Sequence, residues 1–193
     1  AVTGQGEVNI YWDDAAEYSR DVVTGYADFE GYKIYKSRDG GNTWGNPDDM
    51  IYDTDGIFAG WRPYRQYDLS AEEDSLHCVY SRGFDCPEES RRGHPMNGQD
   101  PYFPWFSLGT DTGLDPIKLG EPVVINGDTM RYMFKDQNVT DGLEYTYSVV
   151  AYDMGVEPPF KETYADIGGG QFEVVVDTNY SNPDQWADPE GYA

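Results

Sequence analysis

Residues 138–153 read NVTDGLEYTYSVVAYD, and this stretch decides the fold class. After an Asp-Gly pair, which is typical of a tight turn, large and small side chains alternate with a period of two. That period is the period of a β-strand, in which successive side chains point to opposite faces of the sheet. The sequence therefore predicts a strand with one face made by Tyr145, Tyr147, Val149 and Ala151.

Four more segments show strand patterns. They are residues 7–12 (EVNIYW), 31–36 (GYKIYK), 121–134 (EPVVINGDTMRYMF) and 171–177 (QFEVVVD). Asn126-Gly127 separates two apolar runs, which is the strongest short signal for a β-hairpin. Ala1 and Val2 resemble the end of a further strand. Since no long helical stripe accompanies these segments, we predict an all-β protein with antiparallel strands.

Between residues 51 and 120 the periodicity fades into Gly, Pro, Tyr and acidic residues, and GWRPYRQYDL is the best candidate strand there. A stretch this long without regular structure inside a compact domain is either functional or pinned to the rest. We therefore expect one domain over residues 1–177 with an insertion at about 51–120. Residues 178–193 are polar and contain proline, which is typical of a linker or arm.

The order of these strands resembles the fibronectin type III family, with the five segments in the places of strands B, C, E, F and G. The resemblance implies an antiparallel β-sandwich with a long, loop-rich insertion between strands C and E. It also implies that Tyr145 donates or accepts a hydrogen bond at the corner before its strand, and that Trp12 lies in the core.

The composition limits the function. The chain has 36 Asp and Glu against 13 Lys and Arg, a formal net charge of -23, which disfavours nucleic acids and anionic membrane surfaces as partners. An aromatic content of 16% argues against a disordered acidic segment. No apolar run is long enough to cross a membrane.

The two cysteines, Cys78 and Cys86, enclose seven residues, so we predict a local disulfide and an extracellular or cell-surface location. Two free thiols are one alternative. A zinc site with His77 and His94 is another, although its spacing differs from that of the common zinc fingers.

A turn motif follows the second strand. Ser37, Asp39, Gly41 and Trp44 fit the pattern S-x-D-x-G-x-x-W, which resembles the Asp-box of sialidases, in which the aspartate braces a turn. The pattern occurs once, and the sequence shows no cluster of arginines that would bind a sugar carboxylate. We therefore expect a structural role for this turn.

Acidic residues concentrate where the resemblance brings two loops to one pole of the sandwich. Calcium prefers six to eight oxygen ligands, and this pole offers enough carboxylates for a calcium site. The alternative is a solvated acidic loop, which a chain of this charge shows by chance. The candidate ligands are Asp13, Asp14, Glu17, Asp28, Glu30 and Asp153.

The insertion also carries aromatic residues that could form an exposed surface, namely Trp61, Tyr102, Trp105 and Phe106. Such side chains form either a platform for sugar rings or a subunit contact, or else a secondary core that pins the insertion. No nucleophile elbow, metal triad or phosphate loop is present, so we do not predict an enzyme.

These features favour a non-catalytic extracellular structural or adhesive module. Such a module mediates protein-protein assembly at a cell surface, filament or virion exterior, with neighbouring copies or other proteins as partners. The alternative is a carbohydrate-binding module, or an accessory domain of a secreted glycoside hydrolase, with a glycan as its partner.

Overall fold

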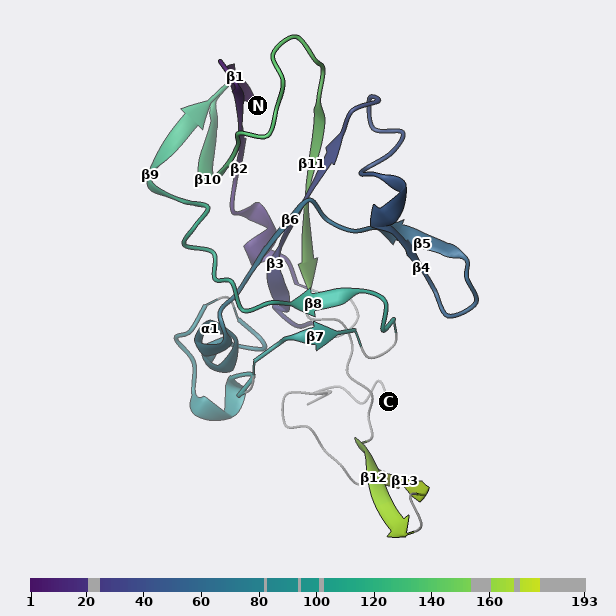
Figure 1. The fold of residues 1–193 in the computed structure, drawn as a ribbon. Coiled ribbons are helices and arrows are strands. Elements are labelled where there is room, and N and C mark those ends of the chain that lie inside the picture. The colour runs from purple at the N-terminus through teal and green to yellow at the C-terminus, as the bar shows by residue number, and fades with distance from the viewer. Residues whose placement is uncertain are drawn as a thin grey trace.

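A computed structural model describes residues 1–20, 25–81, 83–93, 95–100, 103–153, 161–168 and 171–177 (Figure 1). One antiparallel sheet has the order β1 (Val2–Gly4), β2 (Glu7–Trp12), β10 (Asp128–Asp136) and β9 (Lys118–Ile125). A second antiparallel sheet has the order β11 (Thr146–Asp153), β3 (Phe29–Ser37) and β6 (Arg65–Asp68). The predicted all-β class with antiparallel sheets is thus confirmed.

The main core lies between these two sheets, which gives a sandwich-like arrangement. Ile34 of β3 is fully buried and packs in one cluster with Ile10 of β2 and Phe134 of β10. Beside it, the Trp12 ring lies 5.6 Å from Tyr32 and 5.8 Å from Tyr132, between centroids, so that it contacts both layers. The alternation read from the sequence is the reason: every second side chain of β2, β3 and β10 faces the other sheet.

A buried ion pair also joins the two layers. Lys36 Nζ on β3 lies 2.7 Å from Asp136 Oδ2 on β10, and both side chains are almost fully buried. The hydroxyls of Tyr147 and Tyr64 donate to the same carboxylate at 2.7 and 3.0 Å. Because every oxygen of Asp136 has a donor, the pair is held without an unsatisfied charge.

The local signals of the sequence are present in the structure. Asn126 and Gly127 have φ of 55° and 97°, as a two-residue hairpin turn requires, and they connect β9 to β10. The Tyr145 hydroxyl accepts a hydrogen bond of 3.0 Å from the backbone N–H of Thr140 in the preceding corner. The turn lies directly before the start of β10, and the hydrogen bond of Tyr145 lies directly before the start of β11.

The last predicted strand, residues 171–177, is present as β13 (Gln171–Asp177). It pairs with β12 (Lys161–Gly168) in a separate two-stranded sheet. The physical reason is proximity: β12 and β13 are neighbours in the sequence, so their pairing closes a shorter loop than pairing with β11 would.

Residues 51–120 contain more regular structure than the sequence indicates. GWRPYRQYDL divides at a proline into β5 (Phe58–Trp61) and β6, and β5 pairs with β4 (Met50–Tyr52). In Figure 1 the β4–β5 hairpin projects from the side of the second sheet. The remaining elements are η1 (Ala15–Tyr18), η2 (Pro47–Asp49), α1 (Ala71–Leu76), η3 (Glu88–Ser90), β7 (Gly98–Gln99) and β8 (Ser107–Gly109). Within the described ranges, no helix has the length and apolar character needed to cross a membrane.

Candidate functional site

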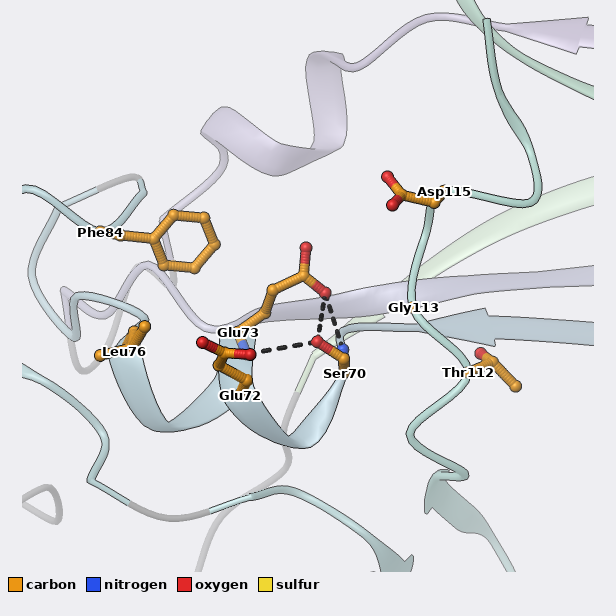
Figure 2. Close-up of a pocket in the computed structure, with 8 residues that line it drawn as sticks. All are labelled: Ser70, Glu72, Glu73, Leu76, Phe84, Thr112, Gly113 and Asp115. Atoms are coloured by element: carbon orange, nitrogen blue, oxygen red, sulfur yellow. Dashed lines mark hydrogen bonds between the residues drawn. The ribbon is translucent and has the colours of Figure 1, made fainter.

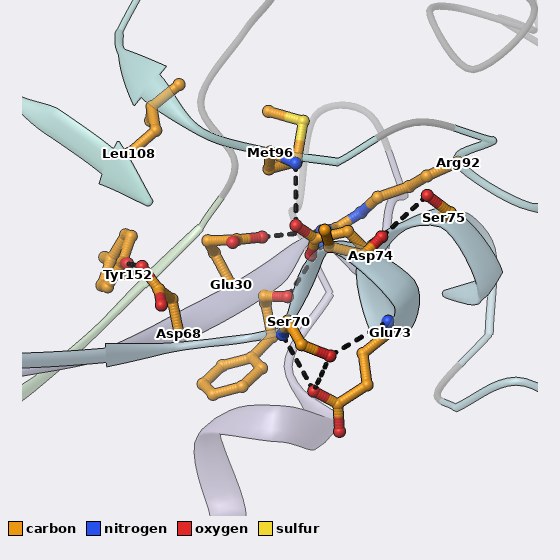
Figure 3. A network of polar contacts seen from close by, with 12 residues as sticks. Glu30, Asp68, Ser70, Glu73, Asp74, Ser75, Arg92, Met96, Leu108 and Tyr152 are labelled. Carbon is orange, nitrogen blue, oxygen red and sulfur yellow. Dashed lines mark hydrogen bonds and ion pairs between the residues drawn. The ribbon is translucent and has the colours of Figure 1, made fainter. Parts of the chain in front are cut away.

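Arg92 fastens the long insertion to the sandwich (Figure 3). Its side chain is fully buried, and Nη1 lies 2.7 Å from Glu30 Oε2 on β3 and 2.9 Å from Asp74 Oδ1 on α1. Nη2 donates to the backbone carbonyl of Phe29 at 2.9 Å. One guanidinium therefore ties α1 and the segment after the disulfide to the start of β3.

The two carboxyl groups of this network differ in protonation. Burial raises the pKa of Glu30 to about 9, against the opposing effect of Arg92, and burial raises the pKa of Asp74 to about 6. At neutral pH Glu30 is therefore protonated and Asp74 ionised, so one carboxylate balances one guanidinium. No group of the described residues donates to Glu30 Oε1, so this oxygen can carry the proton and donate it towards Asp74.

Asp68 at the end of β6 makes a second anchor. Its buried carboxylate accepts from the backbone N–H groups of Thr110 and Thr112, at 2.5 and 2.8 Å. Close by, a Cβ built on Gly109 would overlap the carbonyl oxygen of Met96, so only glycine fits there. These contacts place the segment before Thr110 against the outer face of the second sheet.

The result of this anchoring is an aromatic groove beside β3 and β6. The groove has a volume of about 680 Å³ and lies between the outer face of the second sheet, the β4–β5 hairpin and the segment before β8. The Phe106 ring lies against Gly60 of β5, where an added Cβ would meet Cε1 at 3.6 Å. The aromatic side chains that line the groove are Tyr35, Tyr52, Trp61, Tyr64, Trp105 and Phe106.

Polar groups lie among these rings. Lys33 Nζ lies 3.9 Å from the ring centroid of Tyr152 and donates to the carbonyl oxygen of Ser107 at 2.8 Å. Gln66 Nε2 donates to the Tyr152 hydroxyl at 2.7 Å. Lys33 and Gln66 are partners across β3 and β6 and both line the groove, so their hydrogen-bonding groups are fixed in position by the sheet.

Most of the predicted aromatic set comes together in this groove. Trp61, Trp105 and Phe106 all line it and are all half-buried, whereas Tyr102 lies outside the described residues. The Trp105 ring lies 6.4 Å from Phe106 and 5.7 Å from the exposed Phe103, between centroids. The rings thus pack on one another while keeping part of their surface open to solvent.

Four of the predicted calcium ligands have contacts of their own in the structure. Asp14 pairs with Arg131 at 3.0 Å, and Glu17 accepts from the Tyr132 hydroxyl at 2.5 Å. Glu30 belongs to the Arg92 network. Asp13 accepts from a backbone N–H of its own turn. The antiparallel pairing of β11 with β3 places Asp153 opposite Phe29, the residue that follows Asp28. The described ranges contain no group of three or more His, Cys, Asp or Glu side chains placed to share a metal ion.

A second hollow, of about 430 Å³, lies at the start of α1 (Figure 2). Its lining includes the carboxylates of Glu72, Glu73 and Asp115. Glu73 is engaged in a capping box, in which its Oε2 accepts from the backbone N–H of Ser70 at 2.9 Å and Ser70 Oγ accepts from the Glu73 N–H at 3.3 Å. The hydrogen bonds in this hollow thus cap the N-terminus of α1.

The turn motif and the cysteines have structural roles in this geometry. Asp39 accepts from the backbone N–H of Thr43 at 2.9 Å and from its hydroxyl at 2.8 Å, and these bonds lower the pKa of Asp39 to about 2. Ser37 Oγ accepts from the N–H of Gly41 at 2.8 Å, and the Trp44 ring lies 6.3 Å from Tyr35, between centroids. Cys78 and Cys86 form a disulfide, which removes them as zinc ligands.

One cluster was missed at the sequence level. The sequence showed no group of arginines, but Arg38, Arg62 and Arg65 line one hollow of about 450 Å³ next to the aromatic groove. Arg38 follows β3, and the other two flank the proline between β5 and β6. Only the pairing of β6 with β3 brings them together, so no local signal would have revealed them.

A comparison of the chain with known protein families, with curated protein sequences and with solved structures finds no match in any of the three. The function is therefore argued from the geometry of the chain itself.

Proposed function

We propose that this chain is a non-catalytic, extracellular binding module and that the aromatic groove binds a glycan. The observation that carries the proposal is the convergence of Trp61, at the end of β5, with Trp105 and Phe106, just before β8, on one open groove. Part of each ring stays accessible, which a secondary core would not require. Sugar rings present faces of C–H groups that pack on aromatic rings, and aromatic surfaces with a polar end are typical of binding sites.

The size and polarity of the groove support a short oligosaccharide. A volume of about 680 Å³ lies within the range of small-molecule sites. Gln66, Gln99 and Lys33 supply amide and ammonium groups at its floor and rim, and hydroxyl groups of a sugar both donate to and accept from such groups. The disulfide supports an extracellular location, where glycans are abundant.

The proposal predicts binding that depends on the aromatic rings. Trp105→Ala is expected to weaken binding to a glycan array at least about fivefold, because truncating a central aromatic group typically removes about 1 kcal/mol or more. Phe84→Ala serves as the matched control, since Phe84 is also an exposed aromatic residue of the insertion but lines the other hollow. An array on which the wild-type chain binds nothing, or on which both variants lose binding equally, would contradict the proposal.

A second candidate function is assembly with neighbouring copies, and the edge of β11 favours it. Among the described strands, β11 pairs only with β3, and its other edge forms no ladder with any of them. The strand lacks Gly and Pro, and Val150 is 45% exposed. A free edge of this kind adds a strand from another chain in β-augmentation.

Assembly predicts an oligomer whose formation depends on β11. In native mass spectrometry over a range of concentrations, Val150→Glu is expected to abolish the oligomer, because a charged side chain on an edge strand disfavours strand addition. Val124→Glu is the control, since Val124 is an exposed valine on β9, the edge of the other sheet. A monomer at every concentration would exclude this candidate and leave glycan binding unaffected.

A further inference from the structure

The arginine pocket, defined by Arg38, Arg62, Arg65, Trp44 and Tyr64, reverses the sign of the charge that dominates the chain. Four of the 13 Lys and Arg residues line it, the three arginines and Lys36, whereas Asp39 and Asp49 are its carboxylates. The lining therefore carries a formal charge of about +2 in a chain of net charge -23. Such a local reversal indicates a site for an anionic group.

The guanidinium groups in this pocket are not paired with carboxylates of the described residues. Within the described part of the chain, Arg38, Arg62 and Arg65 form no ion pair with a carboxylate, although Asp and Glu outnumber Lys and Arg by 36 to 13. By contrast, Lys36 is paired with Asp136. All three arginine side chains are exposed, so a ligand can reach their N–H groups.

The carboxylates of the pocket are already engaged. Asp39 is held by Thr43 in the turn, as described above, and Asp49 Oδ2 accepts from the backbone N–H of Asn46 at 2.8 Å. The guanidinium of Arg65 lies 4.5 Å from the ring centroid of Tyr64 and donates to the Tyr64 carbonyl at 2.7 Å. Stacking on a ring fixes the plane of a guanidinium while leaving its other N–H groups free for a planar, bidentate acceptor.

The arginine pocket and the aromatic groove form one surface. The segment that contains Arg62, Pro63, Tyr64 and Arg65 lines both hollows. A chain of sugar rings lying on Trp61 and Trp105 would therefore bring a substituent within reach of the arginines. Hydrophobic stacking and anion recognition then act on the same molecule.

We propose that the glycan bound by this module is acidic, with a carboxylate or a sulfate ester held by Arg38, Arg62 and Arg65. The inference rests on the proposed glycan function and specifies the chemical class of its ligand. Carboxylate and sulfate both present oxygen pairs that match the guanidinium fork.

The test is isothermal titration calorimetry with three oligosaccharides of equal length: a galacturonate oligomer, a sulfated galactan oligomer and a neutral glucan oligomer. The wild-type chain is expected to bind one of the two acidic oligomers at least about tenfold more tightly than the neutral one. The acidic oligomer that is preferred identifies the anionic group. The preference is expected to shrink when NaCl is raised from 0.05 to 0.5 M, because salt screens exposed charges.

Arg38 lines the arginine pocket and does not line the aromatic groove. Arg38→Gln is therefore expected to reduce the preference for the acidic oligomer about tenfold while leaving affinity for the neutral oligomer unchanged. Lys118→Gln is the charge-matched control, since it removes one cation from exposed β9 without touching either hollow, and it is expected to change nothing. An unchanged melting temperature for Arg38→Gln shows that the fold is intact.

Each other outcome has a definite meaning. Equal binding of neutral and acidic oligomers in the wild-type chain would overturn this inference and leave the glycan proposal standing. No binding of any oligomer would overturn both. Binding of a glutamate oligopeptide as tightly as the acidic sugar would show that the pocket recognises a protein segment, and would overturn the acidic-glycan assignment.

Discussion

At the residue scale, the most unusual position is Glu30, a carboxyl group with no exposed surface beside a buried arginine. Burying an ionised group is costly unless it is paired, and Arg92 has two carboxyl groups to share. Protonation of Glu30 solves this problem, because it leaves one anion for one cation. The site is therefore stable only while that proton remains, which makes it sensitive to pH.

The pKa of Glu30 sets the sign of this pH dependence. Its folded pKa of about 9 lies above the value of 4.5 for an unperturbed Glu, so between these values the folded state holds a proton that the unfolded state has lost. The contribution to stability is thus complete below pH 4.5 and lost as the pH rises towards 9. We expect the free energy of unfolding to fall by about 1.4 kcal/mol per pH unit from this group. Urea unfolding at pH 6.5, 7.5 and 8.5 measures this slope.

Glu30→Gln is neutral at every pH and keeps the shape of the side chain, so it is expected to remove most of the slope. Glu72→Gln, on the exposed face of α1, is expected to keep it. The pH range of these unfolding measurements starts above pH 6, because Asp74, with a pKa of about 6, has then lost its proton in both the folded and the unfolded state. If Glu30→Gln and the wild-type chain have parallel slopes, the carboxyl group is ionised in the folded protein.

At the element scale, the sequence predicts strands well and their partners poorly. Residues 7–12 and 171–177 coincide with β2 and β13, because a period of two is a local property of the chain. The Asn126-Gly127 turn was found for the same reason. In principle β13 can pair with the edge of β12 or with the edge of β11. Nothing within residues 171–177 indicates which of the two edges is used.

The insertion shows why the site was predicted only in part. Its aromatic residues were recognised from composition, but the groove they form depends on anchors that are distant in sequence. Arg92 lies 62 residues from Glu30, and Thr112 lies 44 residues from Asp68. The arginine pocket depends on the pairing of β6 with β3, and Glu30, one of the expected calcium ligands, is engaged by the distant Arg92. Such long-range pairs leave no periodic signal in the chain.

At the scale of the whole molecule, the net charge of -23 acts against the folded state. Folding brings like charges closer together, and the resulting repulsion is long-range in solutions of low ionic strength. The ion pairs of the described residues relieve this repulsion at only a few places, such as Arg131 with Asp14 and Lys135 with Glu7. Solution ions must therefore supply much of the screening.

Raising NaCl from 0.02 to 0.5 M is accordingly expected to stabilise the chain by about 1 kcal/mol or more, a rise in melting temperature of about 2–4 °C for a chain of this size. If screening alone is responsible, CaCl₂ and MgCl₂ at matched ionic strength produce the same rise. A cation that binds only the folded state adds RT ln(1 + [L]/Kd), so a calcium site would appear as an extra increase with CaCl₂ that EDTA removes. Because three of the predicted calcium ligands, Asp14, Glu17 and Glu30, already have partners within the protein, we expect equal curves for the two divalent salts. A calcium-specific increase that is lost in the double variant Asp13→Asn, Asp28→Asn would instead show that these carboxylates converge on a bound ion.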